Sequence, residues 1–318
     1  MKNSKNTVVI ALGGNAILRT GDKGTVEEQY RNIKETVKHL LPFLMREDLN
    51  IVITHGNGPQ VGNALLRSEL SQQAVPPHTL DVCGAETQGS IGYMMAQPLQ
   101  EALNQAGIKR SVISMVTRTI VDKDDPAFKN PTKFVGLFYS EEEANKLAKE
   151  KGWVVKEDSG RGWRRVVPSP IPREILEYRA IEDLTDRGHL VIAVGGGGIP
   201  VCEDKGSLIG VEAVIDKDLG SALLAEELGA GLFIILTSVS QVALNFGKDN
   251  EKKISKMTLS EAKRYYNEGH FPAGSMGPKI LAAIKYLEAI KGRVLITSPE
   301  SLTSALKNQT GTWITSNS

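Results

Sequence analysis

The chain has 318 residues, which is enough for one large α/β domain or two lobes. Its content of 41% hydrophobic and 24% charged residues is ordinary for a soluble globular protein. A formal net charge of +1 gives no electrostatic support for nucleic acid or an acidic membrane as the main partner. No apolar run approaches the roughly 20 residues of a membrane span and no signal peptide is recognised, so we expect a cytoplasmic protein.

Cysteine and histidine usage argues against a disulfide framework or a protein-bound metal. Cys83 and Cys202 are too few for the first and lack metal-ligand spacing for the second. We expect both to be small buried apolar residues. His55 and the other histidines form no triad or metal pattern, so we assign them no catalytic role.

Apolar runs of strand length alternate with helical stretches, which predicts a largely parallel sheet with helices on both faces. Thr25 with Glu28 resembles a capping box that opens a long amphipathic helix. Asp216 can cap a helix over residues 219–228, and Gly229 suits its carboxyl end. The predicted strands lie near residues 7–12, 50–54, 111–116, 190–194, 232–237 and 293–297.

Two stretches interrupt this alternation. Residues 118–172 are rich in Asp, Pro, Arg and Trp, which predicts an inserted subdomain or lid with short strands. Residues 199–215 are typical of a hairpin. Because a second set of strands and helices begins near residue 216, we divide the chain into an N-terminal lobe, 1–215, and a C-terminal lobe, 216–318.

Three predicted strands end in glycine-rich loops, Gly13-Gly14-Asn15, Gly56-Asn57-Gly58 and Gly195–Gly198. Backbone N–H groups at such strand ends are free of side chains, which suits phosphate binding. The loops do not match the dinucleotide pattern G-x-G-x-x-G, and the Walker A pattern is absent. A Rossmann dehydrogenase and a P-loop kinase are therefore disfavoured. For any single loop, glycines that only allow a tight turn are the alternative.

Two lysines stand at predicted helix starts. Lys217 lies between Asp216 and Asp218, and Lys279 follows Pro278, which suits the first helical position. A cation in the first turn costs about 0.3–1 kcal/mol, and a bound anion reverses the sign. With the glycine loops, these lysines predict chemistry on a phosphoryl group. Exposed lysines tolerate the same cost, and Asp218 either holds the ammonium or is an acid favoured by the helix dipole.

Further basic residues lie in the inserted segment. Lys133 is a third cationic candidate for the site. Arg161, Arg164 and Arg165 surround Trp163, an arrangement that fits either a phosphate clamp or a stacked surface patch. We favour the surface interpretation for Arg164 and Arg165.

The longer motifs resemble the amino acid kinase family, and more specifically its carbamate kinases. They keep their order between residues 7 and 315, so chance is a poor explanation. The resemblance implies a three-layer α/β/α sandwich with a mainly parallel central sheet, a small protruding subdomain at about 118–172, and a homodimer. The motifs are 11–16, 56–62, 80–85, 130–133, 160–163, 214–219 and 273–279.

The resemblance also implies an activity. It is reversible phosphoryl transfer between MgATP and carbamate, giving ADP and carbamoyl phosphate, often run toward ATP during arginine breakdown. The lobe 1–215 would bind carbamate or carbamoyl phosphate and the lobe 216–318 the nucleotide, with Mg²⁺ held by phosphates and water. Two alternatives are a related kinase for another small carboxylate or carbamate, and a non-catalytic nucleotide-binding regulator.

Carried over residue by residue, the resemblance assigns site roles. The catalytic residues would be Lys133, Lys217, Asp218 and Lys279. The substrate-binding residues would be Gly13, Gly14, Asn15, Gly56, Asn57, Gly58, Gly196 and Gly197. The nucleotide-binding residues would be Thr237, Ser238, Ala243, Met276, Gly277 and Pro278. Related kinases often carry an aspartate near Ser238 or Ser240 and an aromatic residue near Ala243, so the nucleotide pocket departs from the pattern here.

Overall fold

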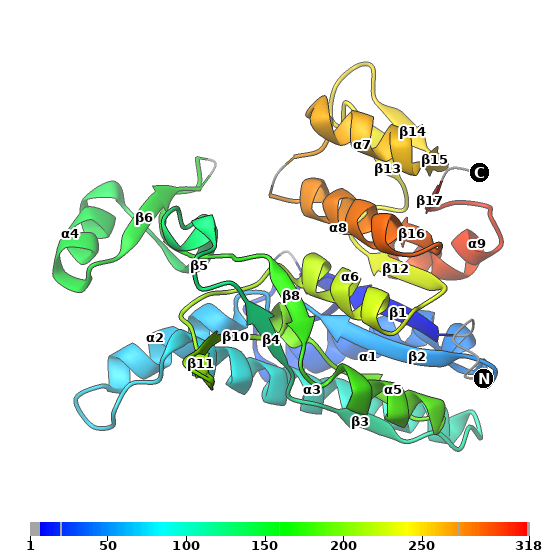
Figure 1. Cartoon of the computed structure of the whole chain (residues 1–318), viewed down its shortest axis with the longest axis horizontal. Coiled ribbons are helices and arrows are strands. Elements are labelled where there is room, and N and C mark those ends of the chain that lie inside the picture. The colour runs from blue at the N-terminus through cyan, green and yellow to red at the C-terminus, as the bar shows by residue number, and fades with distance from the viewer. Residues whose placement is uncertain (1–6, 20, 159, 273, 317–318) are drawn as a thin grey trace.

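An eight-stranded sheet runs through the part of the chain that the computed structural model describes, residues 7–19, 21–158, 160–272 and 274–316 (Figure 1). Its order is β15-β17-β16-β12-β1-β2-β9-β3, and every neighbouring pair is parallel except β16 with β17. The strands are β1 (Thr7–Leu12), β2 (Asn50–His55), β3 (Val112–Ser114), β9 (Leu190–Ile192), β12 (Leu232–Leu236), β15 (Lys256–Thr258), β16 (Arg293–Thr297) and β17 (Thr312–Thr315). The six predicted strands are therefore present.

Helices cover both faces of this sheet, which confirms the three-layer prediction. Along β1, Val9 and Ala11 point into one apolar core, while Val8 and Ile10 point into the other. A strand buried on both sides must be apolar throughout, and this explains the continuous runs in the sequence. One face is covered by α5 (Tyr178–Asp186), α6 (Lys217–Glu227), α7 (Leu259–Asn267) and α8 (Met276–Ala289), and the other by α1 (Val26–Leu44), α3 (Leu80–Gln105) and α9 (Leu302–Leu306).

The predicted caps of α1 and α6 are confirmed, whereas Pro278 is the third residue of α8, which begins at Met276, and not the first as predicted. At the start of α1, the Thr25 hydroxyl accepts from the Glu28 N–H at 3.3 Å, and the Glu28 carboxylate accepts from the Thr25 N–H at 3.0 Å. Asp216 caps α6 by accepting the N–H groups of its first turn. Gly229 follows the last turn of α6 with φ +56°, in the left-handed region that glycine favours.

The inserted segment divides into two parts. Its ends are β4 (Arg118–Val121) and β8 (Pro172–Ile175), which join the hairpin β10 (Ile199–Asp204) and β11 (Ser207–Gly210) in a second sheet of order β11-β10-β4-β8. Its middle forms a subdomain that protrudes from the body (Figure 1). This subdomain comprises β5 (Lys133–Tyr139), α4 (Glu141–Lys151), β6 (Val154–Glu157) and β7 (Trp163–Val167), with sheet order β5-β7-β6.

The remaining elements are short, apart from α2. They are η2 (Gly14–Ala16), α2 (Gln60–Ser71), η3 (Pro126–Phe128), η4 (Gly195–Gly197), β13 (Val242–Leu244), β14 (Lys252–Ile254) and η5 (Pro299–Ser301). The main sheet continues across residues 215 and 216, because β12 pairs with β1. The division into two functional lobes therefore stays a prediction. Ala273, part of the last motif, lies outside the described residues.

The surface interpretation of Arg164 and Arg165 is wrong, because both side chains are only 18% exposed. The Arg164 guanidinium lies 4.8 Å from the ring centre of Phe138 and donates to Asp158 at 3.0 Å. Arg165 lies 5.1 Å from the ring centre of Trp153. These cation–π stacks and ion pairs add to the packing of the subdomain beside its buried apolar residues Val135, Ala144, Val166 and Val167. The arginines do stack on aromatic rings, but on Phe138 and Trp153 and not on Trp163, the ring that the sequence placed among them.

Two smaller expectations concern burial. Cys83 and Cys202 are free and buried, as predicted. Burial also raises the pKa of the Cys83 thiol to about 11, which keeps it in the unreactive protonated form.

Of the helices that the structure describes, none combines the length and apolar character needed to cross a membrane.

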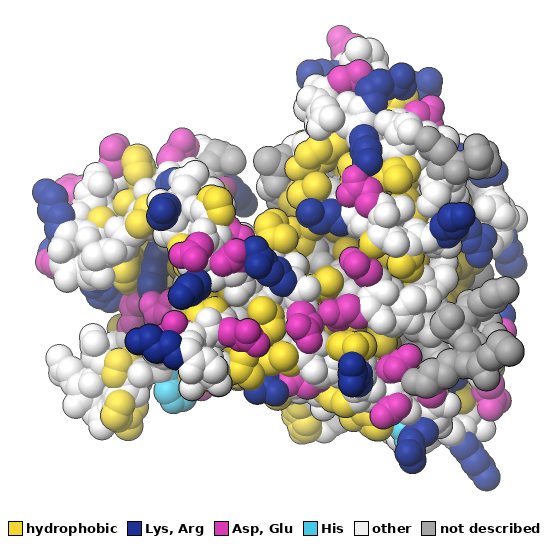
Figure 2. Space-filling view, viewed as in Figure 1, with side chains coloured by type: hydrophobic (Ala, Val, Ile, Leu, Met, Phe, Trp, Pro, Cys, Tyr) yellow, Lys and Arg dark blue, Asp and Glu magenta, His cyan; other side chains and the backbone are white. Residues whose placement is uncertain are grey.

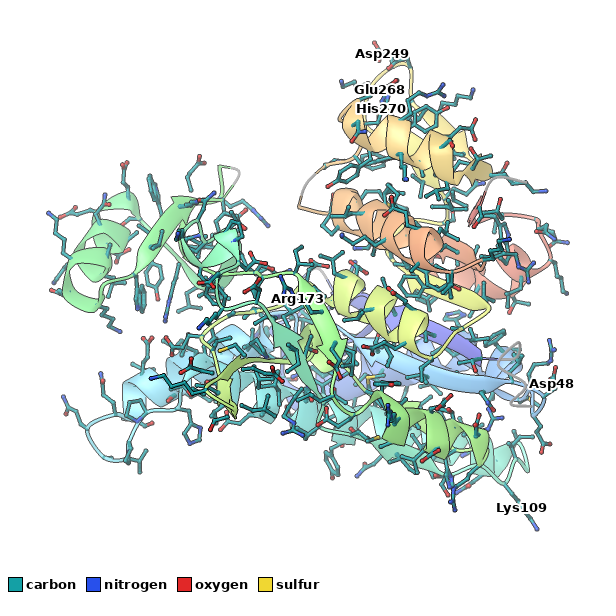
Figure 3. All side chains as sticks on the ribbon, in the orientation of Figure 1. Asp48, Lys109, Arg173, Asp249, Glu268 and His270 are labelled. Atoms are coloured by element: carbon teal, nitrogen blue, oxygen red, sulfur yellow. The ribbon has the colours of Figure 1, made fainter. Side chains whose placement is uncertain are left out.

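A half-buried carboxyl group, that of Glu227, ties α6 to β8, the strand that carries Arg173, labelled in Figure 3. Both carboxyl oxygens of Glu227 accept from the Ile175 N–H, at 3.0 and 3.3 Å. Burial raises the pKa of Glu227 to about 7, the Ile175 hydrogen bond opposes this, and the carboxylates of Glu174 and Glu226 reinforce it. Folding therefore favours the protonated form of Glu227.

We expect the Glu227→Gln variant to become more stable than the native chain as the pH rises. The native contribution is complete below the unfolded pKa of 4.5 and is lost as the pH rises through about 7. Glutamine keeps an acceptor for Ile175 and does not ionise. Denaturant unfolding from about pH 5 to about pH 8 should show the free-energy difference between variant and native chain growing by about 1–2 kcal/mol. A difference that stays constant with pH would contradict this.

Candidate active site

Segments far apart in the sequence meet at one cavity of about 350 Å³. It lies beyond the carboxyl ends of β1, β2 and β9 and between the protruding subdomain and the start of α8. The space-filling view shows a notch in the outline between the subdomain and the C-terminal part of the chain (Figure 2). The predicted site residues that line the cavity are Gly14, Gly56, Asn57, Gly58, Lys133, Gly196, Lys217, Asp218, Pro278 and Lys279.

Other predicted residues lie elsewhere. A second cavity of about 390 Å³ is lined by Gly13, Asn15, Thr237 and Ser238. Because Gly13 and Gly14 are adjacent, one loop borders both cavities. Gly197, Ala243, Met276 and Gly277 line neither cavity, so their assigned roles have no geometric support. Gly197 instead packs against α6, where the position of a Cβ on Gly220 would lie 2.8 Å from the Gly197 Cα.

A Lys–Asp–Lys cluster forms one wall of the 350 Å³ cavity. Asp218 accepts from the Lys217 ammonium at 2.6 Å and from the Lys279 ammonium at 3.3 Å. The side chains of Lys217, Asp218 and Lys279 are 13%, 4% and 14% exposed. Two cations with one carboxylate leave a positive charge that favours an anion in the cavity.

Burial and charge act on this cluster in opposite directions. Burial lowers the pKa of Lys217, and the nearby Lys279 lowers it further, while Asp218 opposes both. Burial also works against ionisation of Asp218, but the two ammonium groups outweigh it and hold the pKa of this carboxyl below its ordinary value. Asp218 is therefore the counter-ion that lets two lysines be buried side by side.

Asp216 joins the protruding subdomain to the cluster. One carboxylate oxygen accepts from the Asp218 N–H at 2.9 Å, as the cap of α6, and the other accepts from the Lys133 ammonium at 2.9 Å. Lys133 is the first residue of β5, and its side chain is 35% exposed. The capping role of Asp216 was predicted, but its ion pair was not, because Lys133 is 83 positions away.

The Gly195–Gly198 loop lies against the loop that follows β2. A Cβ on Gly195 would lie 2.6 Å from the His55 ring, and a Cβ on Gly196 would lie 2.2 Å from the Asn57 amide. Contacts this short leave no room for a side chain. The glycines therefore do more than allow a turn, because they let two loops pack directly together with Gly196 facing the cavity.

Polar side chains that the sequence analysis missed hold these loops in place. Gln88 donates to the carbonyls of Gly195 and Thr117, at 2.9 and 3.1 Å, and accepts from the Thr117 N–H at 2.8 Å. Thr87 donates to the Asn57 amide oxygen at 3.1 Å. The available signal was a pair of polar residues, Thr87 and Gln88, on the buried face of α3.

His55, the last residue of β2, is buried as a neutral ring and does not line the cavity. Burial lowers the pKa of His55 to about 4, the hydrogen bond with the Gly56 carbonyl opposes this, and Lys217 adds to it. Within the described ranges of the chain, no cluster of three or more His, Cys, Asp or Glu side chains is able to hold a metal ion.

Comparisons with known proteins agree over nearly the whole chain. The model of the amino acid kinase family matches residues 6–298. A carbamate kinase of Thermococcus kodakarensis is 55% identical over 309 residues, covering 96% of this chain and 98% of that protein. A carbamate kinase of Pyrococcus furiosus is 51% identical with the same coverage. The solved carbamate kinase from Giardia lamblia bound to AMP-PNP is 42% identical with a TM-score of 0.90, covering 98% of this chain and 99% of that chain.

The chain therefore belongs to the amino acid kinase family. Within this family it groups with the carbamate kinases, and it is an enzyme of the phosphotransferase class. The resemblance and the fold class predicted from the sequence are both confirmed.

Proposed function

We propose that this chain catalyses reversible phosphoryl transfer between ATP and carbamate, forming ADP and carbamoyl phosphate. The observation that carries the proposal is the Lys217–Asp218–Lys279 cluster beside glycine loops in one cavity. Phosphoryl transfer depends on positioning and charge neutralisation, because its transition state spreads negative charge over the equatorial oxygens. Relatives named carbamate kinases, up to 55% identical, support carbamate as the acceptor.

In the proposed reaction, a carbamate oxygen supplies the electron pair for the new O–P bond. The bond between the γ-phosphorus and the ADP oxygen breaks, and its electrons stay on ADP. Because the carbamate oxygen is already anionic, no general base is needed, which fits a neutral His55 with a pKa of about 4. Lys217 and Lys279 would neutralise the transferring group, and backbone N–H groups of the loops at Gly14 and Gly58 would hold it.

We propose that Mg²⁺ accompanies the nucleotide and supplies further charge neutralisation at its phosphates. Asp216 and Asp218, which line the cavity, already face Lys133, Lys217 and Lys279. These residues fit a metal held mainly by phosphates and water, which is how Mg²⁺ is often bound in kinases.

We assign the nucleotide to the C-terminal lobe, residues 216–318, and carbamate or carbamoyl phosphate to residues 1–215. Thr237 and Ser238 border the second cavity, which fits a nucleotide role for this region. The related Giardia lamblia enzyme binds AMP-PNP. We further propose that the reaction runs toward ATP in arginine catabolism and takes place in the cytoplasm, where ADP is available.

We also propose a homodimer. Val82 and Tyr93 on α3 are 39% and 59% exposed, and Leu208 and Ile209 on β11 are each 45% exposed. The two elements touch, because a Cβ on Gly210 would lie 2.0 Å from the Asp81 carboxylate. Exposed apolar side chains on two elements that touch suit an isologous contact between two copies.

A coupled assay tests the proposed activity. Purified chain with carbamoyl phosphate, ADP and Mg²⁺ should form ATP, which hexokinase and glucose-6-phosphate dehydrogenase convert into an NADPH signal. Heat-denatured chain is the blank. Acetyl phosphate in place of carbamoyl phosphate tests whether the enzyme is specific for the carbamoyl group. Folded protein that gives no signal above the blank, or that prefers acetyl phosphate by a wide margin, would overturn the proposal.

A further inference from the structure

The protruding subdomain meets α2 at a point where two backbones touch with no side chain between them. A Cβ on Gly62, the third residue of α2, would lie 2.5 Å from the Gly136 nitrogen and 2.7 Å from its Cα. Real Cβ atoms essentially never approach other atoms within 3.0 Å. Gly136, on β5, has φ +75°, which favours glycine as well. The present spacing between α2 and β5 therefore requires glycine at position 62.

Apolar contacts and ion pairs around the Gly62–Gly136 contact also hold α2 against the subdomain. Val61 and Leu65 of α2 share an apolar cluster with Val135 of β5. Glu69 lies one turn after Leu65 on α2. Its carboxylate accepts from Lys151 at 2.8 Å and from Arg165 at 3.3 Å, and both of these residues belong to the subdomain. The subdomain is thus docked on α2, and the glycine contact decides how closely it sits.

Both partners of this contact lead directly to the cavity. Gly136 lies three residues after Lys133 on β5, about 10 Å along an extended strand. Lys133 reaches Asp216 at 2.9 Å and lines the cavity. On the other side, α2 begins at Gln60, directly after the Gly56–Gly58 loop. A shift of β5 away from α2 is therefore transmitted to the Lys133 ammonium.

We propose that Gly62 is a positioning residue whose contact with Gly136 sets where the Lys133 ammonium stands in the active site. The inference rests on the proposed phosphoryl transfer, in which Lys133 acts on the transferring group. Gly62 lines no part of the cavity and acts only through Lys133. We expect a substitution at Gly62 to lower kcat, because a displacement of about 1 Å at a catalytic group can cost up to 100-fold in rate.

Kinetics of Gly62→Ala and Gly62→Val test the proposal. We expect kcat to fall about 10-fold to 100-fold for alanine and further for valine. The KM for ADP should change less than about twofold, because the nucleotide is assigned to the other lobe. The control Arg67→Ala alters an exposed side chain of the same helix and should leave kcat unchanged. A fall in nucleotide affinity with an unchanged kcat would overturn the proposal.

A double-mutant cycle asks whether the effect passes through Lys133. In the Lys133→Ala background, Gly62→Ala should lower kcat by less than about twofold, because the ammonium that it displaces is already gone. If the two fold-changes multiply instead, Gly62 acts by another route and the positioning role is wrong.

A third measurement is independent of turnover. Amine labelling followed by mass spectrometry should show Lys133 reacting faster in Gly62→Ala than in the native chain, because its pair with Asp216 opens. Exposed Lys285 serves as the internal reference, and melting curves check folding.

If Gly62→Ala does not fold, Glu69→Gln weakens the same contact between α2 and the subdomain and should give the same labelling change. An inactive native chain would overturn the proposed function, whereas unchanged labelling in a folded variant would overturn the role of Gly62.

Discussion

Replacing Lys217 by alanine is expected to lower kcat by about 10²–10³-fold, the cost typical of removing one preorganised donor from a charged transition state. The Lys217 ammonium lies at the start of α6, lines the cavity and is 13% exposed. In such a site water screens charge poorly, so each cation counts for more than it would at the surface. The remaining Lys279 and the loop N–H groups are expected to leave a small residual rate.

The variant should stay folded, because Asp218 keeps Lys279 as a partner at 3.3 Å. The control is Lys285→Ala, which removes an exposed lysine from α8, the helix that also carries Lys279. Initial rates of ATP formation at saturating ADP and carbamoyl phosphate give kcat for both variants. A Lys217→Ala enzyme that keeps more than about a tenth of the native kcat would show that this ammonium does not stabilise the transition state.

Replacing Asp218 by asparagine is expected to destabilise the ligand-free chain by about 3 kcal/mol. Asp218 is 4% exposed and is the shared counter-ion of Lys217 and Lys279. Without its charge, two ammonium groups that are only 13% and 14% exposed lie near each other with no carboxylate between them. We also expect kcat to fall, because neither lysine is then held by a carboxylate.

An anion in the cavity should partly replace the lost carboxylate. ADP or inorganic phosphate should therefore raise the melting temperature of Asp218→Asn more than that of the native chain. The control is Asp48→Asn, which breaks an ion pair with Arg46 where both side chains are 56% exposed, and Asp48 lies at the edge of the molecule in Figure 3. This control should leave the stability nearly unchanged, because solvent screens an exposed ion pair. Equal ligand shifts in the native chain and in Asp218→Asn would contradict the counter-ion role.

Much of the fold was predictable because the physical signals are local. Apolar runs such as Val8–Leu12 and Leu232–Leu236 are continuous since both faces of their strands are buried. The caps at Thr25 and Asp216 satisfy backbone N–H groups only a few residues away, so their signature is contained in a short window.

The catalytic candidates were predictable in a different way. Lys217, Asp218 and Lys279 stand at helix starts, where the sequence shows both the cap and the unfavourable placement of a cation. Their roles came from resemblance, and the structure adds that the three side chains form one cluster. The predicted positions Ala243 and Met276 line neither cavity, so their assignment stays a prediction.

From the sequence alone we could predict six strands of the main sheet, the caps of α1 and α6, the family and the residue types that suit phosphoryl chemistry, but not the short strands β15 and β17. The tertiary structure was needed to show that Lys133 meets Asp216, that Gly62 lies against Gly136, and that the Arg164 side chain is largely covered, at 18% exposure. The difference lies in how far apart along the chain the interacting residues are. Hydrogen bonding and periodicity along one element act over a few residues, whereas these contacts join segments whose separation is set by the packing of whole layers. The glycine loops contain both kinds of information, since their composition is local but the surface that each one touches is not.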